Sequence, residues 1–194
     1  MHIKVLVDAD SVAREAAAMI AAEARAAVAE RGRFVAAVSG GHTPWVMLRA
    51  LAGEKVPWES VHVVQVDELK AAATQYALTL QDVAGSPPVL DLVHLGLGPD
   101  GHTASLVPGD AVLEITDADV AVTEAYQERR RMTLTYPMLN RSRRVLWLVT
   151  GSEKAGMLVR LRDGDRSIPA GRVRRNRALV LADRAAADQL GTNE

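Results

Sequence analysis

The fold is decided by residues 89–108, which read VLDLVHLGLGPDGHTASLVP. The first seven form a short apolar run bounded by Pro88 and Gly96, which is the pattern of a buried strand. The loop that follows is rich in glycine, which lets a ligand approach the backbone closely. In open α/β sheets, ligands bind just beyond the carboxyl ends of the strands. We therefore predict that Asp100 and His102 belong to a binding site; an ordinary exposed surface loop is the alternative.

A second stretch, residues 34–44, repeats this arrangement. The apolar run FVAAV leads directly into SGGHTP, and proline in a first helical turn predicts a helix from Pro44 to about Ala52. Exposed amides at a helix N-terminus, flanked by hydroxyl groups, suit an oxyanion. The pattern predicts a phosphate site, with a tight strand-to-helix turn as the alternative. The candidate ligands are Ser39, Gly40, Gly41 and Thr43.

Strands and helices alternate along the rest of the chain. Further strands are expected at residues 3–7, 61–66, 120–123, 145–149 and 178–181, and further helices from Asp10 or Ser11 to about 30, at 71–83, and from about 152 to 162. This alternation predicts an α/β fold, a mainly parallel twisted sheet with helices on both faces, Rossmann-like, with a small accessory β/α portion. We expect one domain over residues 1–194.

Three more side chains are candidates because of where they fall. Asp67 ends the strand at 61–66, so its carboxylate points into the same crevice as the two loops. Lys154 lies in the first turn of a predicted helix, where a cation opposes the helix dipole unless an anion is nearby. Arg131 closes a run of three arginines, and Arg129 or Arg130 remain open as its replacement.

Composition excludes several classes of protein. Lys and Arg total 23 against 24 for Asp and Glu, so nucleic acid is not expected as a partner. The chain has no cysteine, which excludes disulfides and thiolate metal sites. No apolar run reaches the roughly 18 residues of a membrane helix, and the start does not resemble a secretory signal. The expected compartment is the cytoplasm.

Taken in order, the loops SGGHTP, VDE and GLGPDGHTASLVP, together with RMTLT and GSEKA, resemble the 6-phosphogluconolactonase family, relatives of glucosamine-6-phosphate deaminase. The resemblance covers nearly the whole chain. It implies hydrolysis of 6-phosphoglucono-1,5-lactone to 6-phosphogluconate, in the oxidative pentose phosphate pathway, without metal or organic cofactor. The expected partner is thus a small sugar-phosphate lactone, and a monomer is expected.

The resemblance also implies roles for the candidate residues. His102 is expected to be the general base, and Asp67 to orient either the imidazole or the attacking water. Backbone amides around Gly40, Gly41 and Gly101 are expected to hold the oxyanion or the phosphate. The remaining phosphate and sugar ligands implied by the resemblance are Ser39, Thr43, Asp100, Arg131 and Lys154.

Other functions are less well supported. The deaminase branch places a glutamate five residues after the loop histidine, where this chain has Val107. A protein that binds sugar phosphates without turning them over stays open, although such a protein has no need of His102 as a base. A dinucleotide site at Gly96-Leu97-Gly98 does not fit, because the loop leads to Pro108 rather than into a long helix.

The chain departs from the family after Glu68. The family continues this motif with an arginine and a long loop, whereas here Leu69 and a helical pattern follow at once, a few tens of residues short. A natural deletion, an engineered deletion and a mobile loop missing from the sequence are the three explanations. The lack of turn residues at the junction favours the last.

Overall fold

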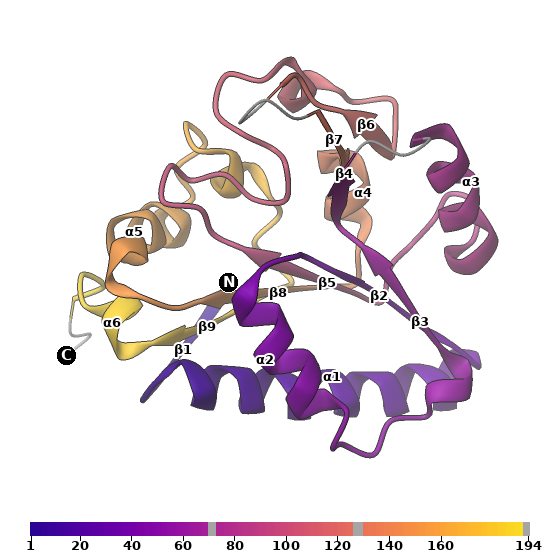
Figure 1. The fold of residues 1–194 in the computed structure, drawn as a ribbon, viewed down its shortest axis with the longest axis horizontal. Coiled ribbons are helices and arrows are strands. Elements are labelled where there is room, and N and C mark those ends of the chain that lie inside the picture. Colours follow the sequence, from indigo (N-terminus) through magenta and orange to yellow (C-terminus); the bar gives the residue numbers. More distant parts are fainter. Residues whose placement is uncertain (70–72, 126–129, 192–194) are drawn as a thin grey trace.

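The computed structural model describes residues 1–69, 73–125 and 130–191. Its centre is a six-stranded sheet whose neighbouring strands all run parallel, in the order β1-β9-β8-β5-β2-β3 (Figure 1). The strands are β1 (His2–Leu6), β2 (Phe34–Val38), β3 (Val61–Gln65), β5 (Leu92–Gly96), β8 (Arg144–Val149) and β9 (Ala178–Asp183). The predicted α/β fold with a mainly parallel sheet is confirmed.

Helices cover both faces of this sheet, as predicted. Helices α1 (Ala9–Arg31) and α2 (His42–Leu51) lie on one face, and α3 (Ala73–Ala84), α4 (Tyr136–Arg141), α5 (Ala155–Asp163) and α6 (Arg184–Ala187) pack on the other (Figure 1). Strand side chains alternate between the two faces. In β5, for example, Leu92 joins the core under α1 and α2, whereas Val93 and Leu95 join the opposite core.

The ends of the first two helices differ from the prediction by a few residues. Asp8 caps α1, because its Oδ1 accepts the amide of Ser11 at 2.7 Å, whereas Asp10 and Ser11 lie inside the first turn. Gly32 ends α1 in the left-handed conformation, with a φ of 75°. Helix α2 begins at His42, two residues before Pro44, so Pro44 lies within its first turn.

A small antiparallel sheet accompanies the main sheet. Its order is β4-β7-β6, formed by β4 (Asp67–Leu69), β7 (Arg131–Leu134) and β6 (Val120–Val122). Strand β4 runs through the Glu68–Leu69 junction in a single register with β7, so the junction is a strand and not the passage into a helix that the sequence suggested. The predicted start of the next helix, Ala71, lies outside the described residues; α3 is described from Ala73.

Four short 3-10 helices complete the described fold: η1 (Trp58–Ser60), η2 (Ala111–Glu114), η3 (Ser152–Lys154) and η4 (Pro169–Arg172). The helix expected from about 152 to 162 is therefore two elements, η3 and then α5. In the part of the chain that the structure describes, no helix has the length and apolar character needed to cross a membrane.

Candidate active site

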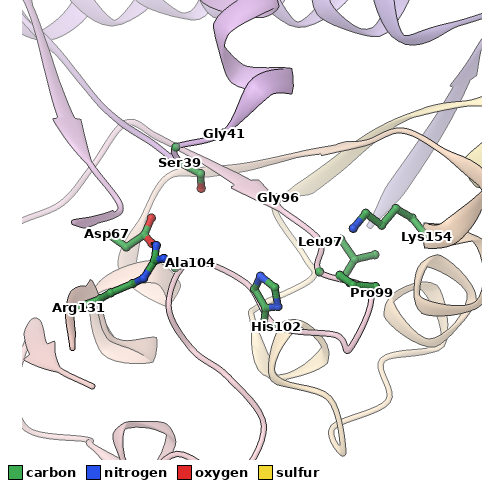
Figure 2. A pocket seen from close by; sticks show the side chains of 12 residues that line it. Ser39, Gly41, Asp67, Gly96, Leu97, Pro99, His102, Ala104, Arg131 and Lys154 are labelled. Atoms are coloured by element: carbon green, nitrogen blue, oxygen red, sulfur yellow. The ribbon is translucent and has the colours of Figure 1, made fainter. Parts of the chain in front are cut away.

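The carboxyl ends of the central strands open onto a cavity of about 360 Å³ (Figure 2). The loop after β2 forms one wall, the loop after β5 forms another, and side chains from β4, β7 and η3 complete it. This is the place where parallel α/β sheets bind ligands. The predicted site residues that line it are Ser39, Gly40, Gly41, Asp67, His102, Arg131 and Lys154.

The loop after β5 is held by its own backbone. The amide of Gly98 donates to the carbonyl of His102 at 2.8 Å, and the amide of Gly101 donates to the carbonyl of Gly98 at 3.0 Å. The hydroxyl of Thr103 donates to the carbonyl of Gly96 at 2.9 Å. Gly98 also touches the imidazole, since a Cβ built there would lie 2.1 Å from Nδ1 of His102. The backbone of the loop therefore lies directly against the His102 ring.

Asp100 holds the imidazole of His102. Its Oδ1 lies 2.5 Å from Nδ1 of the ring and accepts the backbone amide of His102 at 3.1 Å. Burial acts to raise the pKa of Asp100, but the hydrogen bonds from the His102 amide and ring outweigh it and lower that pKa. The carboxylate thus stays ionised and favours the proton on Nδ1. Nε2 is then the nitrogen that takes up a further proton.

Asp67 bonds to Ser105 and lies near Arg131, which leaves the second of its two implied roles, orienting a water, as the prediction that this placement fits. Its Oδ2 accepts the hydroxyl of Ser105 at 2.7 Å and lies 4.0 Å from a terminal nitrogen of Arg131. Figure 2 shows Asp67 and Arg131 together on one side of His102 and Lys154 on the other. The carboxylate bonded to the ring is therefore Asp100. Asp67 stands where it can act on Arg131 or on a water.

Gly101 supports the loop from behind and is not among the cavity residues. Its φ is 83°, and a Cβ built there would lie 2.6 Å from Cβ of Ile168. Its amide is used by Gly98, and its carbonyl accepts the amide of Ala170 at 3.0 Å. The Gly101 amide therefore already donates to a carbonyl within the loop. It is not available to hold an oxyanion, which the resemblance had implied as one of its roles.

Only one arginine of the run reaches the cavity within the described structure. Arg131 lines it, and its Nε is buried with no hydrogen-bond partner among the described residues. Arg130 instead pairs with Glu124 at 3.0 Å, and both side chains are exposed. Arg129 lies outside the described residues. Arg131 is thus the arginine that the fold brings to the site.

The loop after β2 forms a smaller cavity of about 190 Å³ next to the first. We call it the anion cavity; it is lined by Gly40, Gly41, Thr43, Thr150 and Lys154, among others. Gly41 precedes α2 with a φ of 109°, and no side chain in the described structure caps this helix. No described residue pairs with the Lys154 amine. The N-terminus of a helix without a side-chain cap, two hydroxyl groups and an ammonium group that no described residue pairs with together suit a phosphate.

The sequence reasoning missed several residues around these cavities. Leu97, Pro99 and Ala104 line the larger one. Ala104 has a φ of 52°, rare for a residue with a side chain and typical of functional loops. Thr150 and His94 line the anion cavity. The sequence contained a signal for each of these two residues. Thr150 directly follows a predicted strand, and His94 is a polar residue within an apolar strand.

The titratable residues of the site do not form a metal cluster. Within residues 1–69, 73–125 and 130–191, no group of three or more His, Asp or Glu side chains is placed to hold a metal ion. The polar groups of the site are suited to proton transfer and anion binding.

Comparison with known proteins finds the family model described as glucosamine-6-phosphate isomerases/6-phosphogluconolactonase. It matches two segments, residues 7–69 and 68–181. A 6-phosphogluconolactonase from Synechocystis is 31% identical over 196 residues, covering 79% of this chain and 81% of the relative. A 6-phosphogluconolactonase structure from Trypanosoma cruzi shares the fold, with a TM-score of 0.85 and 21% identity, over 98% of this chain and 97% of that one.

A 6-phosphogluconolactonase from Mycobacterium tuberculosis is 32% identical over 241 residues, covering 97% of this chain and 98% of the relative. That alignment is several tens of positions longer than the 194 residues of this chain. The two family-model segments meet at residues 68 and 69. The relative therefore has residues that this chain lacks, and the family-model match divides at the Glu68–Leu69 junction inside β4.

Proposed function

The chain belongs to the glucosamine-6-phosphate isomerase/6-phosphogluconolactonase family, and we propose that it hydrolyses 6-phosphoglucono-1,5-lactone to 6-phosphogluconate with His102 as general base. The observation that carries this proposal is the Asp100–His102 pair at one wall of a cavity that also contains Arg131 and Lys154. A base and two cations in one cavity suit an anionic substrate that is attacked by water.

His102 performs two proton transfers. Nε2 takes a proton from a water as the water oxygen bonds to the lactone carbonyl carbon, and a tetrahedral oxyanion forms. When the bond from that carbon to the ring oxygen breaks, the imidazolium returns the proton to the departing oxygen. Asp100 accepts the hydrogen bond from Nδ1–H throughout, which keeps the ring in place and stabilises its charged form.

The substrate phosphate binds in the anion cavity. Lys154 supplies a charge, the hydroxyls of Thr43 and Thr150 supply hydrogen bonds, and the first amides of α2, beyond Gly40 and Gly41, supply the positive end of the helix dipole. Ser39 holds the start of this loop against β5, because its hydroxyl donates to the carbonyl of His94 at 3.0 Å. The phosphate thereby anchors the sugar beside His102 in the adjoining cavity.

Arg131 and Asp67 act on the other side of His102. The guanidinium of Arg131 binds the ring oxygen or the carbonyl oxygen of the lactone. Asp67 orients this guanidinium, because its Oδ2 lies 4.0 Å from a terminal nitrogen of Arg131. The family arginine expected after Glu68 is replaced by Leu69 in this chain. Arg131 is therefore the guanidinium available on this wall of the cavity in the described structure.

The deaminase alternative is tested by offering both substrates to the protein. The position of its glutamate holds Val107, a buried apolar side chain, so we expect no ammonia from glucosamine 6-phosphate. Lactone generated by glucose-6-phosphate dehydrogenase is expected to be hydrolysed. His102→Ala should lower kcat at least about a hundredfold, the usual range for loss of a general base. Ammonia release, or full activity of His102→Ala, would contradict the proposal.

We also propose that the protein acts as a monomer in the cytoplasm. The groups assigned above all come from one chain, so the site does not need a second copy. Light scattering after size-exclusion chromatography tests the monomer, and fractionation of cells tests the location.

A further inference from the structure

His94 is a histidine within the apolar strand β5, and the mechanism above does not use it. The residue is 1% exposed. Because strand side chains alternate, the ring lies on the same face as Leu92, the face covered by α1 and α2. Its neighbour in β8 is Leu146, a fully buried member of that core. A polar ring in such a place is costly unless its nitrogens are used.

One nitrogen of this ring holds the loop after β2. The amide of Ser39 donates to Nδ1 of His94 at 3.3 Å, and the Ser39 hydroxyl donates to the carbonyl of the same residue at 3.0 Å. Ser39 is thus tied to β5 by both its backbone and its side chain. Since Ser39 begins the loop that lines the anion cavity, His94 sets where that loop starts.

The other nitrogen carries a hydrogen and lacks a partner. Burial lowers the pKa of His94 to about 4, so the ring is neutral near pH 7. Because Nδ1 accepts a hydrogen bond, the hydrogen of the neutral ring is on Nε2. Nε2 is buried, and none of the described residues accepts from it. Leucine or valine would fill this position in the strand without burying an unpaired N–H group. The presence of histidine therefore needs an explanation.

The explanation lies beside the ring. His94 lines the anion cavity together with Thr43, Thr150 and Lys154. The other polar groups of this cavity are donors or hydroxyls suited to an anion. A neutral imidazole N–H fits that set, because it adds a hydrogen bond without adding a second permanent charge beside Lys154.

We propose that His94 is a positioning residue of the anion cavity: Nδ1 fixes the Ser39 amide, and Nε2–H is the donor that pairs when a phosphate occupies the cavity, with a phosphate oxygen or a water bound to it. This rests on the proposed function in one respect, that the phosphate binds there. The proposal adds His94, which lies beneath the loop after β2, to the residues that favour an anion in this cavity. His94 is not proposed to contact the reacting carbon.

Substitutions separate the two nitrogens. His94→Asn keeps an acceptor near the Nδ1 position and has nothing at Nε2, whereas His94→Gln reaches the Nε2 position with an amide N–H. His94→Leu keeps the size and removes both. The affinity for inorganic phosphate is measured by calorimetry, and KM and kcat are measured with the lactone.

We expect His94→Leu to weaken phosphate binding and to raise KM about tenfold, the effect of one lost hydrogen bond to a charged ligand, with kcat within about threefold of the wild type. His94→Gln should recover part of the affinity that His94→Asn does not. A purely structural role would lower the melting temperature of these variants and leave the phosphate affinity of the folded protein unchanged. Phosphate binding by His94→Leu within about twofold of the wild type would overturn the inference.

A measurement on the unaltered protein covers the case in which these variants fail to fold. Nitrogen-15 spectra of the histidines should show the Nε2–H tautomer for His94, and inorganic phosphate should shift that Nε2–H signal. No shift at saturating phosphate would overturn the inference. If Lys154→Ala loses phosphate while the His94 variants retain it, only the role of His94 is wrong. If the unaltered protein neither binds phosphate nor hydrolyses the lactone, the proposed function fails as well.

Discussion

Gly98→Ala tests whether the loop after β5 holds the ring of His102, the proposed general base, in one position. A Cβ at residue 98 would lie 2.1 Å from Nδ1 of His102, 2.3 Å from Cε1 and 2.6 Å from Cγ. Ordinary contacts begin at about 3.5 Å, so the ring has to move by roughly 1.4 Å or the loop has to open. Either movement breaks the 2.5 Å contact between Nδ1 and Asp100.

The expected loss of activity follows from that displacement. A misplacement of about 1 Å costs on the order of a hundredfold in rate, so we expect kcat for the lactone to fall by about a hundred or more. The strain itself should lower the free energy of unfolding by about 1–3 kcal/mol, which the protein can bear. Far-UV circular dichroism and urea unfolding check that the variant is folded when its activity is measured.

Gly156→Ala is the matched control for this substitution. Gly156 lies in α5 and is not among the residues that line the two cavities, and the nearest atom to an added Cβ is Oε1 of Gln189 at 3.7 Å, an ordinary contact. We expect unchanged kcat and equal or higher stability, since alanine favours a helix by about 1 kcal/mol over glycine. If Gly98→Ala has a kcat within about threefold of the wild type, the claim that this loop fixes the ring is wrong.

Three further predictions concern binding, stability and pH. Lys154→Ala should raise KM about tenfold with kcat nearly kept, because the charge is proposed to bind phosphate; an unchanged KM argues against that role. Asp91→Asn should lower the free energy of unfolding in urea by about 1–3 kcal/mol, since this carboxylate accepts the Val35 amide at 2.8 Å and pairs with Arg31 at 2.9 Å; wild-type stability would refute this. The Ser167 hydroxyl and Arg160 lower the pKa of Asp165 from 3.8 to about 2, so its stabilising effect is present above pH 3.8 and disappears as pH falls through about 2. Melting temperatures of wild type and Asp165→Asn should therefore converge in that acid range, and a constant difference would contradict the assignment.

The parallel sheet and the position of the site could be predicted because their signals are local. Each buried strand ends at, or is directly followed by, a glycine or a polar residue, and parallel strands bring those ends to one edge. Ser39, His102 and Lys154 therefore share one cavity region, although they are far apart in the sequence. The same reasoning could not decide which of three consecutive arginines reaches the site, because nothing in the sequence distinguishes Arg131 from Arg129 and Arg130.

What the sequence did not reveal depends on contacts between distant residues. Strand β4 has three residues and is specified by pairing with β7, more than sixty residues later. Asp100 and Asp67 both follow strands, and only the turn at Gly98 decides that Asp100 is the one bonded to the His102 ring. Asp8, Asp10 and Ser11 are all residue types that cap helices well. Which of them caps α1 therefore depends on where the chain leaves β1.

The decisive experiment is the rate of lactone hydrolysis by this chain, compared with a version that has the additional segment of the mycobacterial relative inserted between Glu68 and Leu69. The lactone is produced in place by glucose-6-phosphate dehydrogenase, and the product is followed through 6-phosphogluconate dehydrogenase. We predict that the chain as it stands exceeds the spontaneous rate, with Arg131 and Lys154 sufficient for binding. Acceleration by the extended version alone would mean that the site needs the additional segment. No acceleration by either version would contradict the account and favour a protein that binds sugar phosphates without turning them over.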